Sequence, residues 1–209
     1  MNLQNPKKFK MMVDQAHEVA LNVLRPISRK YDKAEHAYPK ELDMLASLID
    51  GMNEGGEGIN AGAAVGKRGE TESGNKNGNN MSTALGIIEM CYGDTGLLLS
   101  MPRQGLGNSA IAAVANDEQL ERFKGTWAAM AITEPGCGSD SAAIRTTATQ
   151  DGDEYILNGE KIFVTSGDRA DSVVVWATLD KKLGRAAIKS FVVPKGTPGM
   201  KVERLEHKL

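Results

Sequence analysis

The chain has 209 residues, which at about 150 residues per domain predicts one large or two small domains. Its 25 Lys and Arg nearly balance its 27 Asp and Glu, so the net charge of -2 gives no whole-chain attraction to nucleic acid or to an anionic membrane. No segment approaches the roughly 18 consecutive apolar residues that a membrane span needs, and the start does not resemble a signal peptide. We therefore expect a cytoplasmic protein that binds neither nucleic acid nor membrane.

Cysteine and histidine usage excludes two further classes. Cys91 and Cys137 lie far apart, and the three histidines, His17, His36 and His207, are scattered along the chain. Neither a disulfide framework nor a Cys/His metal site is predicted from such spacing.

The first half of the chain has the periodicity of helices. Between Phe9 and Ile27 apolar residues recur at spacings of three and four, which predicts an amphipathic helix that Pro26 should bend or end. Pro39 suits the first turn of a second helix, which Gly51 should stop.

The segment 51–80 contains nine glycines and six asparagines and is read as a mobile loop. The alternative, a glycine-rich phosphate cradle, lacks the spacing of the known phosphate-binding motifs. Helical character returns over 82–99 and 103–115, and Asn116 and Asp117 are plausible caps of a short helix.

After Gly125 the pattern changes to short runs rich in β-branched and aromatic residues, which predict strands. The predicted strands are 127–133, 144–150, 154–157, 161–165, 172–179, 187–193 and 200–204. Asp151-Gly152 and Asn158-Gly159 lie between strands and suit hairpin turns. We therefore expect an α+β protein, with an all-helical domain over 1–125 followed by an antiparallel, barrel-like β domain over 126–209.

One decapeptide, Ala-Ile-Thr-Glu-Pro-Gly-Cys-Gly-Ser-Asp at 131–140, carries the most chemical information. A strand leads into Thr133, and two glycines remove side chains from the following loop, so that a planar or phosphorylated ligand could approach the backbone. A capped turn without a ligand explains the same residues. The spacing alone does not decide between these two interpretations.

The decapeptide resembles the signature of the acyl-CoA dehydrogenases, in which a small or apolar residue precedes Thr/Ser-Glu-Pro and then Gly-Ser-Asp. The run YILNGEKIFVTSG at 155–167 is similar to the family's second flavin-contacting strand, and FVVP at 191–194 adds support. One departure is Phe163, which stands where many members carry tryptophan. The resemblance covers well over half of the chain, with the two motifs in the expected order.

The resemblance implies an FAD site between a middle β domain and a C-terminal helical domain. It assigns nine residues to cofactor binding: Met130, Ala131, Ile132, Thr133, Gly138, Ser139, Phe163, Val164 and Thr165. Ser139 should also contact the acyl-CoA, and Thr133 and Thr165 are the candidates for the hydroxyls that stabilise reduced flavin.

By the same resemblance the function is flavin-dependent introduction of an α,β double bond into an acyl-CoA thioester. The catalytic base belongs to the C-terminal region of the family, so no catalytic residue is assigned here, and Glu134 and Asp140 are interpreted as turn and helix-cap groups. An electron-transfer flavoprotein and a homo-oligomer, either tetramer or dimer, are the implied partners. The alternatives are a non-catalytic subunit that completes a flavin and acyl-CoA site with a partner, and an acyl-CoA oxidase.

Overall fold

The structure is a computed structural model that describes residues 7–54, 79–102 and 106–207. The described residues up to 102 form one compact unit, and those from 106 onward form another. The sequence predicted two domains, 1–125 and 126–209, with a boundary near Gly125. A compact unit need not be a domain that folds by itself, so this boundary stays a prediction. Within the described residues no helix is both long and apolar enough to cross a membrane.

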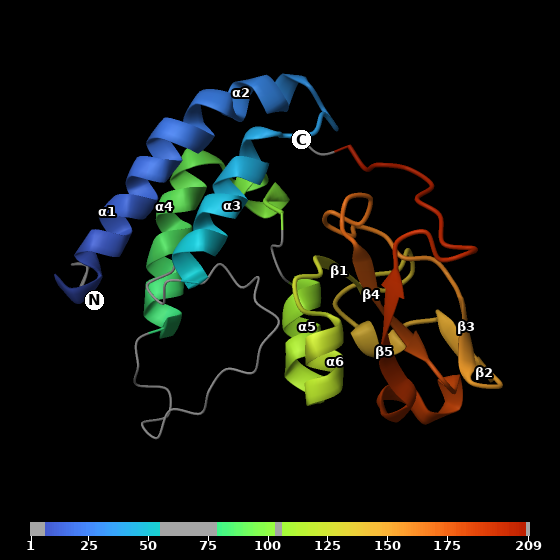
Figure 1. Cartoon of the computed structure of the whole chain (residues 1–209). Coiled ribbons are helices and arrows are strands. Elements are labelled where there is room, and N and C mark those ends of the chain that lie inside the picture. The colour runs from blue at the N-terminus through green and yellow to red at the C-terminus, as the bar shows by residue number, and fades with distance from the viewer. Residues whose placement is uncertain (1–6, 55–78, 103–105, 208–209) are drawn as a thin grey trace. The chain divides into compact units, whose positions relative to one another are not determined.

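The first unit is helical (Figure 1). Its elements are a 3-10 turn (Lys7–Phe9), α1 (Lys10–Val19), a π-helical turn (Ala20–Leu24), α2 (Arg25–Lys33), α3 (Glu41–Glu54) and α4 (Asn79–Ser100). Pro26 does not end the first predicted helix, because it lies in the first turn of α2, where its missing N–H is not needed. The helix changes its hydrogen-bonding pattern just before Pro26, in the π-helical turn.

The core of the first unit forms where α1, the π-helical turn and α4 meet. Gly93 of α4 lies so close to the π-helical turn that a Cβ would be 2.8 Å from the Ala20 carbonyl oxygen. The next residue, Asp94, interrupts α4 with extended backbone (φ -171, ψ 120). Its Oδ1 accepts a hydrogen bond from the Leu97 N–H at 2.8 Å and its Oδ2 one from Ser28 Oγ at 2.5 Å, so this carboxylate restarts the helix and ties it to α2.

Around this crossing the buried apolar side chains form one cluster: Ala16, Leu24, Leu42, Leu45, Met90, Leu97, Leu98 and Met101. The prediction that Gly51 stops the second helix is wrong, because α3 continues to Glu54. Most of the predicted loop over 51–80 lies outside the described residues, and its two ends, at 51–54 and 79–80, are helical.

The second unit begins with α5 (Leu106–Val114) and α6 (Asp117–Arg122). Asn116 is the predicted cap of α6: its Oδ1 accepts from the Gln119 N–H at 2.8 Å, and Gln119 Oε1 accepts in return from the Asn116 N–H at 3.0 Å. This reciprocal pair satisfies two backbone donors that the helix itself leaves unpaired.

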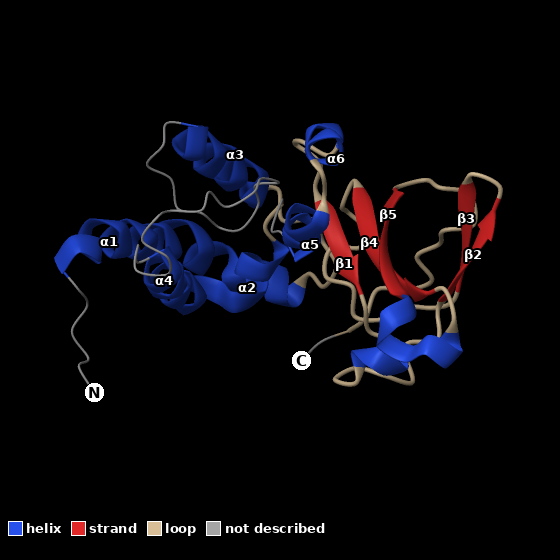
Figure 2. Ribbon diagram, turned by 90° about the horizontal axis from the view of Figure 1, so that it is seen from below, coloured by secondary structure: helices blue, strands red, loops and turns tan. Residues whose placement is uncertain are grey.

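Five strands follow: β1 (Ala128–Ala131), β2 (Thr147–Asp151), β3 (Glu154–Asn158), β4 (Ser172–Thr178) and β5 (Ile188–Pro194). They form one sheet in which the strand order is β1-β4-β2-β3, and β5, which lies off this path, also pairs with β4 (Figure 2). The prediction of an antiparallel, barrel-like sheet is wrong in its detail. The sheet is not closed, and it is mixed because β4 runs parallel to β1 and β2 and antiparallel to β5.

The β2–β3 hairpin confirms the first predicted turn, with Gly152 at φ 60. No strand forms over 161–165 or 200–204, so the second predicted hairpin, at Asn158-Gly159, is wrong. The reason is a competing partner: the Ile162 N–H donates to the Thr133 carbonyl at 2.9 Å, which directs the chain away from β3.

Helix α5 packs directly on β1. A Cβ at Gly107 would lie 2.2 Å from the Ala128 carbonyl oxygen, so only glycine allows this approach. The buried Asn108 beside it donates to the Thr126 carbonyl at 2.7 Å and accepts from the Ala128 N–H at 2.8 Å. The start of β1 is thereby fixed by both packing and hydrogen bonds.

Two leucines of the π-helical turn test which side of this turn is buried in the core of the first unit. Leu24 is fully buried, so Leu24→Ala should lower the free energy of unfolding by about 2–5 kcal/mol through lost contacts and a cavity. Leu21 in the same turn is 37% exposed, and Leu21→Ala should cost less than about 1 kcal/mol. Urea unfolding followed by far-UV circular dichroism measures both, and equal costs would contradict the packing described.

Candidate functional site

The predicted cofactor residues lie on two segments that the structure brings side by side. We call 130–139 the signature segment and 159–167 the second segment. The signature segment leaves β1 after Ala131, and the second follows β3. The Ile162 N–H donates to the Thr133 carbonyl oxygen at 2.9 Å, and Lys161 Nζ donates to the Ile132 carbonyl oxygen at 3.0 Å. Thr133 and the run that begins at Ile162 are therefore neighbours, although about 30 residues separate them.

A tight turn shapes the signature segment after Thr133. The backbones of Glu134 and Cys137 exchange hydrogen bonds at 3.0 and 3.1 Å, which places Pro135 and Gly136 at the tip of the turn. The chain then folds back: a Cβ added at Gly138 would lie 3.9 Å from Thr133 Cγ2. Gly136 has no other atom within 4 Å of such a Cβ. The loop thus presents bare backbone beside Thr133.

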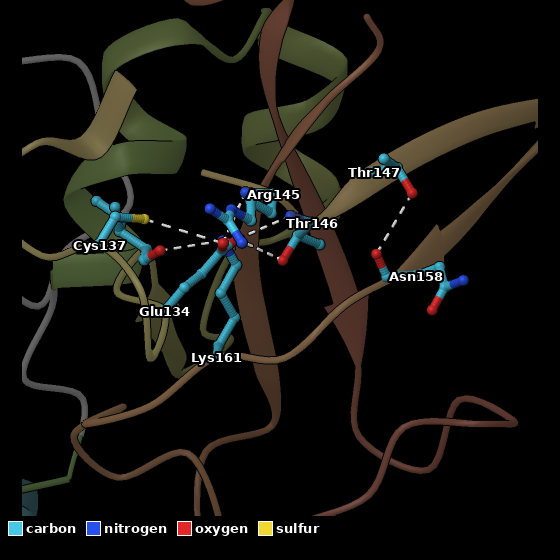
Figure 3. A network of polar contacts seen from close by, with 8 residues as sticks. Glu134, Cys137, Arg145, Thr146, Thr147, Asn158 and Lys161 are labelled. Atoms are coloured by element: carbon cyan, nitrogen blue, oxygen red, sulfur yellow. Dashed lines mark hydrogen bonds and ion pairs between the residues drawn. The ribbon is translucent and has the colours of Figure 1, made fainter. Parts of the chain in front are cut away.

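Glu134 is the anchor of this turn (Figure 3). Its Oε1 accepts from Lys161 Nζ at 2.8 Å and from the Thr146 hydroxyl and N–H at 2.6 and 2.9 Å. Its Oε2 accepts from the Arg145 N–H at 2.6 Å and faces the Cys137 thiol at 3.9 Å. The Glu134 and Lys161 side chains are only 7% and 9% exposed.

This environment decides the charge of Glu134. Burial raises the pKa of its carboxyl group, but the hydrogen bonds from Lys161, Thr146 and the backbone of Arg145 outweigh burial and hold the pKa at about 2. The group is therefore ionised at neutral pH, and its lone pairs are engaged by donors. A carboxylate in this state is a poor proton acceptor, which agrees with its interpretation as a structural group rather than a base.

The second segment turns one side chain outward and the next one inward. Phe163 has left-handed backbone (φ 56) and a side chain that is 58% exposed. Val164 packs instead against the buried cluster of Trp127, Ala129, Ala131, Ala170 and Val173. Thr165 follows and is exposed. An aromatic ring and a hydroxyl thus face outward on the segment that pairs with Thr133.

The remaining predicted residues differ in what they can offer a ligand. Met130, Ile132 and Thr133 are half-buried, while Gly138 and Ser139 are exposed. Ala131 is 2% exposed and its side chain belongs to the core, so it offers only its backbone. Asp140 precedes a 3-10 turn (Ser141–Ala143), but its side chain makes no capping hydrogen bond, so its interpretation as a cap is wrong.

The residues that sequence reasoning missed are those that hold the site together. Lys161 and Thr146 both bind the Glu134 carboxylate, yet neither was predicted to take part. A possible signal for Lys161 is its position as a cation between the largely apolar runs of the second motif. Thr146 carries no such signal, because its role depends on the close approach of Gly159, where a Cβ would lie 2.4 Å from the Thr146 hydroxyl.

The low pKa of Glu134 predicts a defined loss of stability in acid. The unfolded chain, with a carboxyl pKa near 4.5, gains a proton before the folded one does, so the contribution of Glu134 is complete above pH 4.5 and is lost as pH falls toward 2. This contribution is on the order of 3 kcal/mol. Glu134→Gln should therefore flatten the dependence of unfolding free energy on pH across this range.

Urea unfolding at pH 7, 4.5 and 2.5 measures this dependence through tryptophan fluorescence, which reports on the second unit because both tryptophans, Trp127 and Trp176, lie there. Glu154→Gln, at the exposed start of β3, removes no buried contact and is the matched control. An acid response of the Glu134→Gln variant as steep as that of the wild type would refute the assignment.

Comparison with known proteins identifies the second unit. The family model described as acyl-CoA dehydrogenase, middle domain, matches residues 129–209. A short-chain specific acyl-CoA dehydrogenase of Clostridium acetobutylicum is 29% identical over 217 aligned residues, which cover 100% of this chain and 53% of the relative.

Two solved structures have the same fold over nearly the whole chain. Butyryl-CoA dehydrogenase of Megasphaera elsdenii is 27% identical with a TM-score of 0.72, over 95% of this chain and 51% of the other. A chain from a study of the electron transferring flavoprotein of Acidaminococcus fermentans is 29% identical with a TM-score of 0.76, over 100% of this chain and 53% of the other. The chain spans about half the length of these three relatives. Residues 129–209 match the middle domain of the acyl-CoA dehydrogenase family, and the whole chain is similar to members of that family.

Proposed function

We propose that this chain forms one side of an FAD site in an enzyme that introduces an α,β double bond into an acyl-CoA thioester. The observation that carries the proposal is the bond between the Ile162 N–H and the Thr133 carbonyl. It sets the signature turn beside a segment that exposes an aromatic ring at Phe163 and a hydroxyl at Thr165. Similarity to this family supplies the reaction class.

The residues present fit a flavin. A planar ring system needs a flat apolar surface and nearby donors, and the exposed Phe163 ring and the side-chain-free backbone at Gly136 and Gly138 supply the surface. Hydroxyl groups at Thr133 and Thr165 supply donors without bringing a charge. The charges of Glu134 in the turn and Lys161 in the second segment neutralise each other.

We assign the cofactor contacts along the two segments. The signature segment contributes Met130, Ile132 and the Ala131 backbone, and Gly138 and Ser139 close its loop. The second segment contributes the side chains of Phe163 and Thr165 and the backbone of Val164. When bound, FAD accepts the hydride that leaves the β-carbon of the acyl group. The chain's own contribution is to hold the ring against Phe163 and to donate hydrogen bonds from Thr133 and Thr165, where negative charge gathers on reduction.

We assign no base for the α-proton among the residues that the structure describes. Glu134 is ionised but saturated with donors, which makes it a poor acceptor. The base is a carboxylate other than Glu134, and this chain supplies part of the flavin and acyl-CoA site. Ser139, exposed at the end of the signature turn, contacts the acyl-CoA.

The partners follow from the same assignment. The substrate is an acyl-CoA, reduced enzyme passes its electrons to an electron-transfer flavoprotein, and the enzyme works in the cytoplasm as a homo-oligomeric dimer or tetramer. Similarity to an acyl-CoA dehydrogenase supports the assignment of the substrate. Similarity to a chain from a study of an electron transferring flavoprotein supports the assignment of the electron acceptor.

The reaction is tested on purified protein that contains this chain. Absorbance near the flavin bands should reveal bound FAD, and anaerobic addition of saturated acyl-CoA thioesters of graded chain length should bleach it, while a saturated free fatty acid should not. Colourless protein that releases no FAD on denaturation would contradict the proposal.

The role of Phe163 gives a sharper prediction. Phe163→Ala removes the aromatic surface and should weaken FAD binding about tenfold, which corresponds to about 1.4 kcal/mol, in the range of an aromatic stacking contact. Tyr155→Ala, which removes an exposed aromatic residue of β3 that packs on Phe191, is the control and should leave FAD affinity within about twofold. Flavin fluorescence titration measures both, and equal effects would argue against stacking on Phe163.

A further inference from the structure

We infer that Lys161 is a positioning residue for the cofactor: with Glu134 it locks the signature and second segments in the one geometry that receives FAD. The inference rests on the proposed function, because it concerns the same site. Lys161 itself need not touch the cofactor. What it controls is the distance between Thr133 on one segment and Phe163 and Thr165 on the other.

Lys161 makes two hydrogen bonds from the second segment to the signature segment. Lys161 Nζ donates to the Ile132 carbonyl at 3.0 Å and to Glu134 Oε1 at 2.8 Å. The next backbone N–H, of Ile162, donates to the Thr133 carbonyl at 2.9 Å. Three consecutive residues of the signature segment, 132–134, are thus bonded to two consecutive residues of the second.

The second segment needs such links because it lacks a strand ladder. Residues 159–164 belong to no strand of the sheet. The regular hydrogen bonds between the five strands therefore do not hold them. The segment must nevertheless keep Phe163 in left-handed backbone, which a bulky residue adopts only when its neighbours hold it there. Lys161 holds it from one side, and the partly buried Val164 holds it from the other.

Glu134 connects this arrangement to the rigid part of the sheet. Its carboxylate accepts hydrogen bonds from the Arg145 and Thr146 N–H groups, and the chain enters β2 directly after them. Thr146 in turn accepts from the Thr178 N–H of β4 at 2.9 Å. Hydrogen bonds therefore connect Lys161, through Glu134, to two strands of the sheet.

Stability alone does not require a charged pair at this place. Apolar side chains of similar volume can replace a buried ion pair with little loss, whereas removing one partner leaves a buried charge unpaired. A charged pair that also bonds a main-chain carbonyl fixes orientation in a way that apolar packing does not. This difference separates positioning from a merely structural role and can be measured.

The test compares Lys161→Met, Glu134→Gln and the double variant in the purified protein. Each single variant should weaken FAD binding at least tenfold and unfold at lower urea concentration. The double variant carries no unpaired buried charge, so it should regain most of the lost resistance to urea but not the FAD affinity. Flavin fluorescence titration and urea unfolding followed by tryptophan fluorescence give the two quantities.

Lys195→Met is the matched control. Lys195 Nζ also donates to a backbone carbonyl, that of Asp168, at 2.8 Å, but it is exposed and lies outside the two segments. Its substitution should change FAD affinity by less than twofold. An effect on affinity as large as that of Lys161→Met would overturn the inference.

Thiol reactivity gives a readout that needs no cofactor. Cys137 is half-buried in the signature turn and Cys91 is half-buried in the first unit, and both are free thiols. Without FAD, an aromatic disulfide reagent should modify Cys137 several-fold faster in Lys161→Met and in the double variant than in the wild type, with the rate at Cys91 unchanged.

The outcomes separate this inference from the proposed function. Wild-type protein that binds no FAD would refute the proposed function, while faster modification of Cys137 in the variants would still support the role of Lys161. Wild-type affinity for FAD in Lys161→Met, or in the double variant, would overturn the positioning role alone. If Lys161→Met does not fold, the double variant decides between these results.

Discussion

A buried carboxylate is the constraint on which the rest of the site depends. Removing Glu134 from water is costly unless donors replace the solvent, and the structure provides them from the main chain, a hydroxyl and an ammonium group. Those donors come from two places in the sequence, 145–146 and 161, and with the turn that carries Glu134 three segments are brought together. The turn after β1, the entry to β2 and the second segment share this one acceptor.

The sheet and the turn have different tasks. Small residues of β1, such as Ala128 and Ala129, allow α5 and the neighbouring strands to pack at close distance, and the buried Asn108 fixes where β1 begins. Packing of this kind gives a rigid frame but little that a ligand can bind. The polar turn at the end of β1 is held by hydrogen bonds, so its shape depends on that frame and on Glu134.

Some of this could be predicted from the sequence. The helical first half, the cap at Asn116 and the turn at Gly152 follow from periodicity and local backbone preferences, which act over a few residues. The strand predicted over 161–165 fails because β propensity describes how a residue suits a sheet and not whether a partner strand is there. Ile162 found its partner at Thr133 instead.

Periodicity and local backbone preferences could not predict the direction of the strands or the role of Glu134. The continuous apolar run of β4 indicates a buried strand but does not record in which direction its neighbours run, so it did not specify the parallel pairing with β1. Glu134 resembles an ordinary turn residue because its partners lie 11 to 27 residues further along the chain. Burial of a carboxylate is a property of the folded arrangement, and only the resemblance in the two motifs indicated that their segments meet.

The electrostatics of the turn also explain how the chemical work would be divided. A group that removes an α-proton must be free to accept it, and the hydrogen bonds that make Glu134 a good anchor lower its basicity. Anchor and base therefore place opposite demands on a carboxylate, and one residue cannot meet both. A carboxylate held as Glu134 is held can shape a binding turn, and a base for proton abstraction would have to be a different residue.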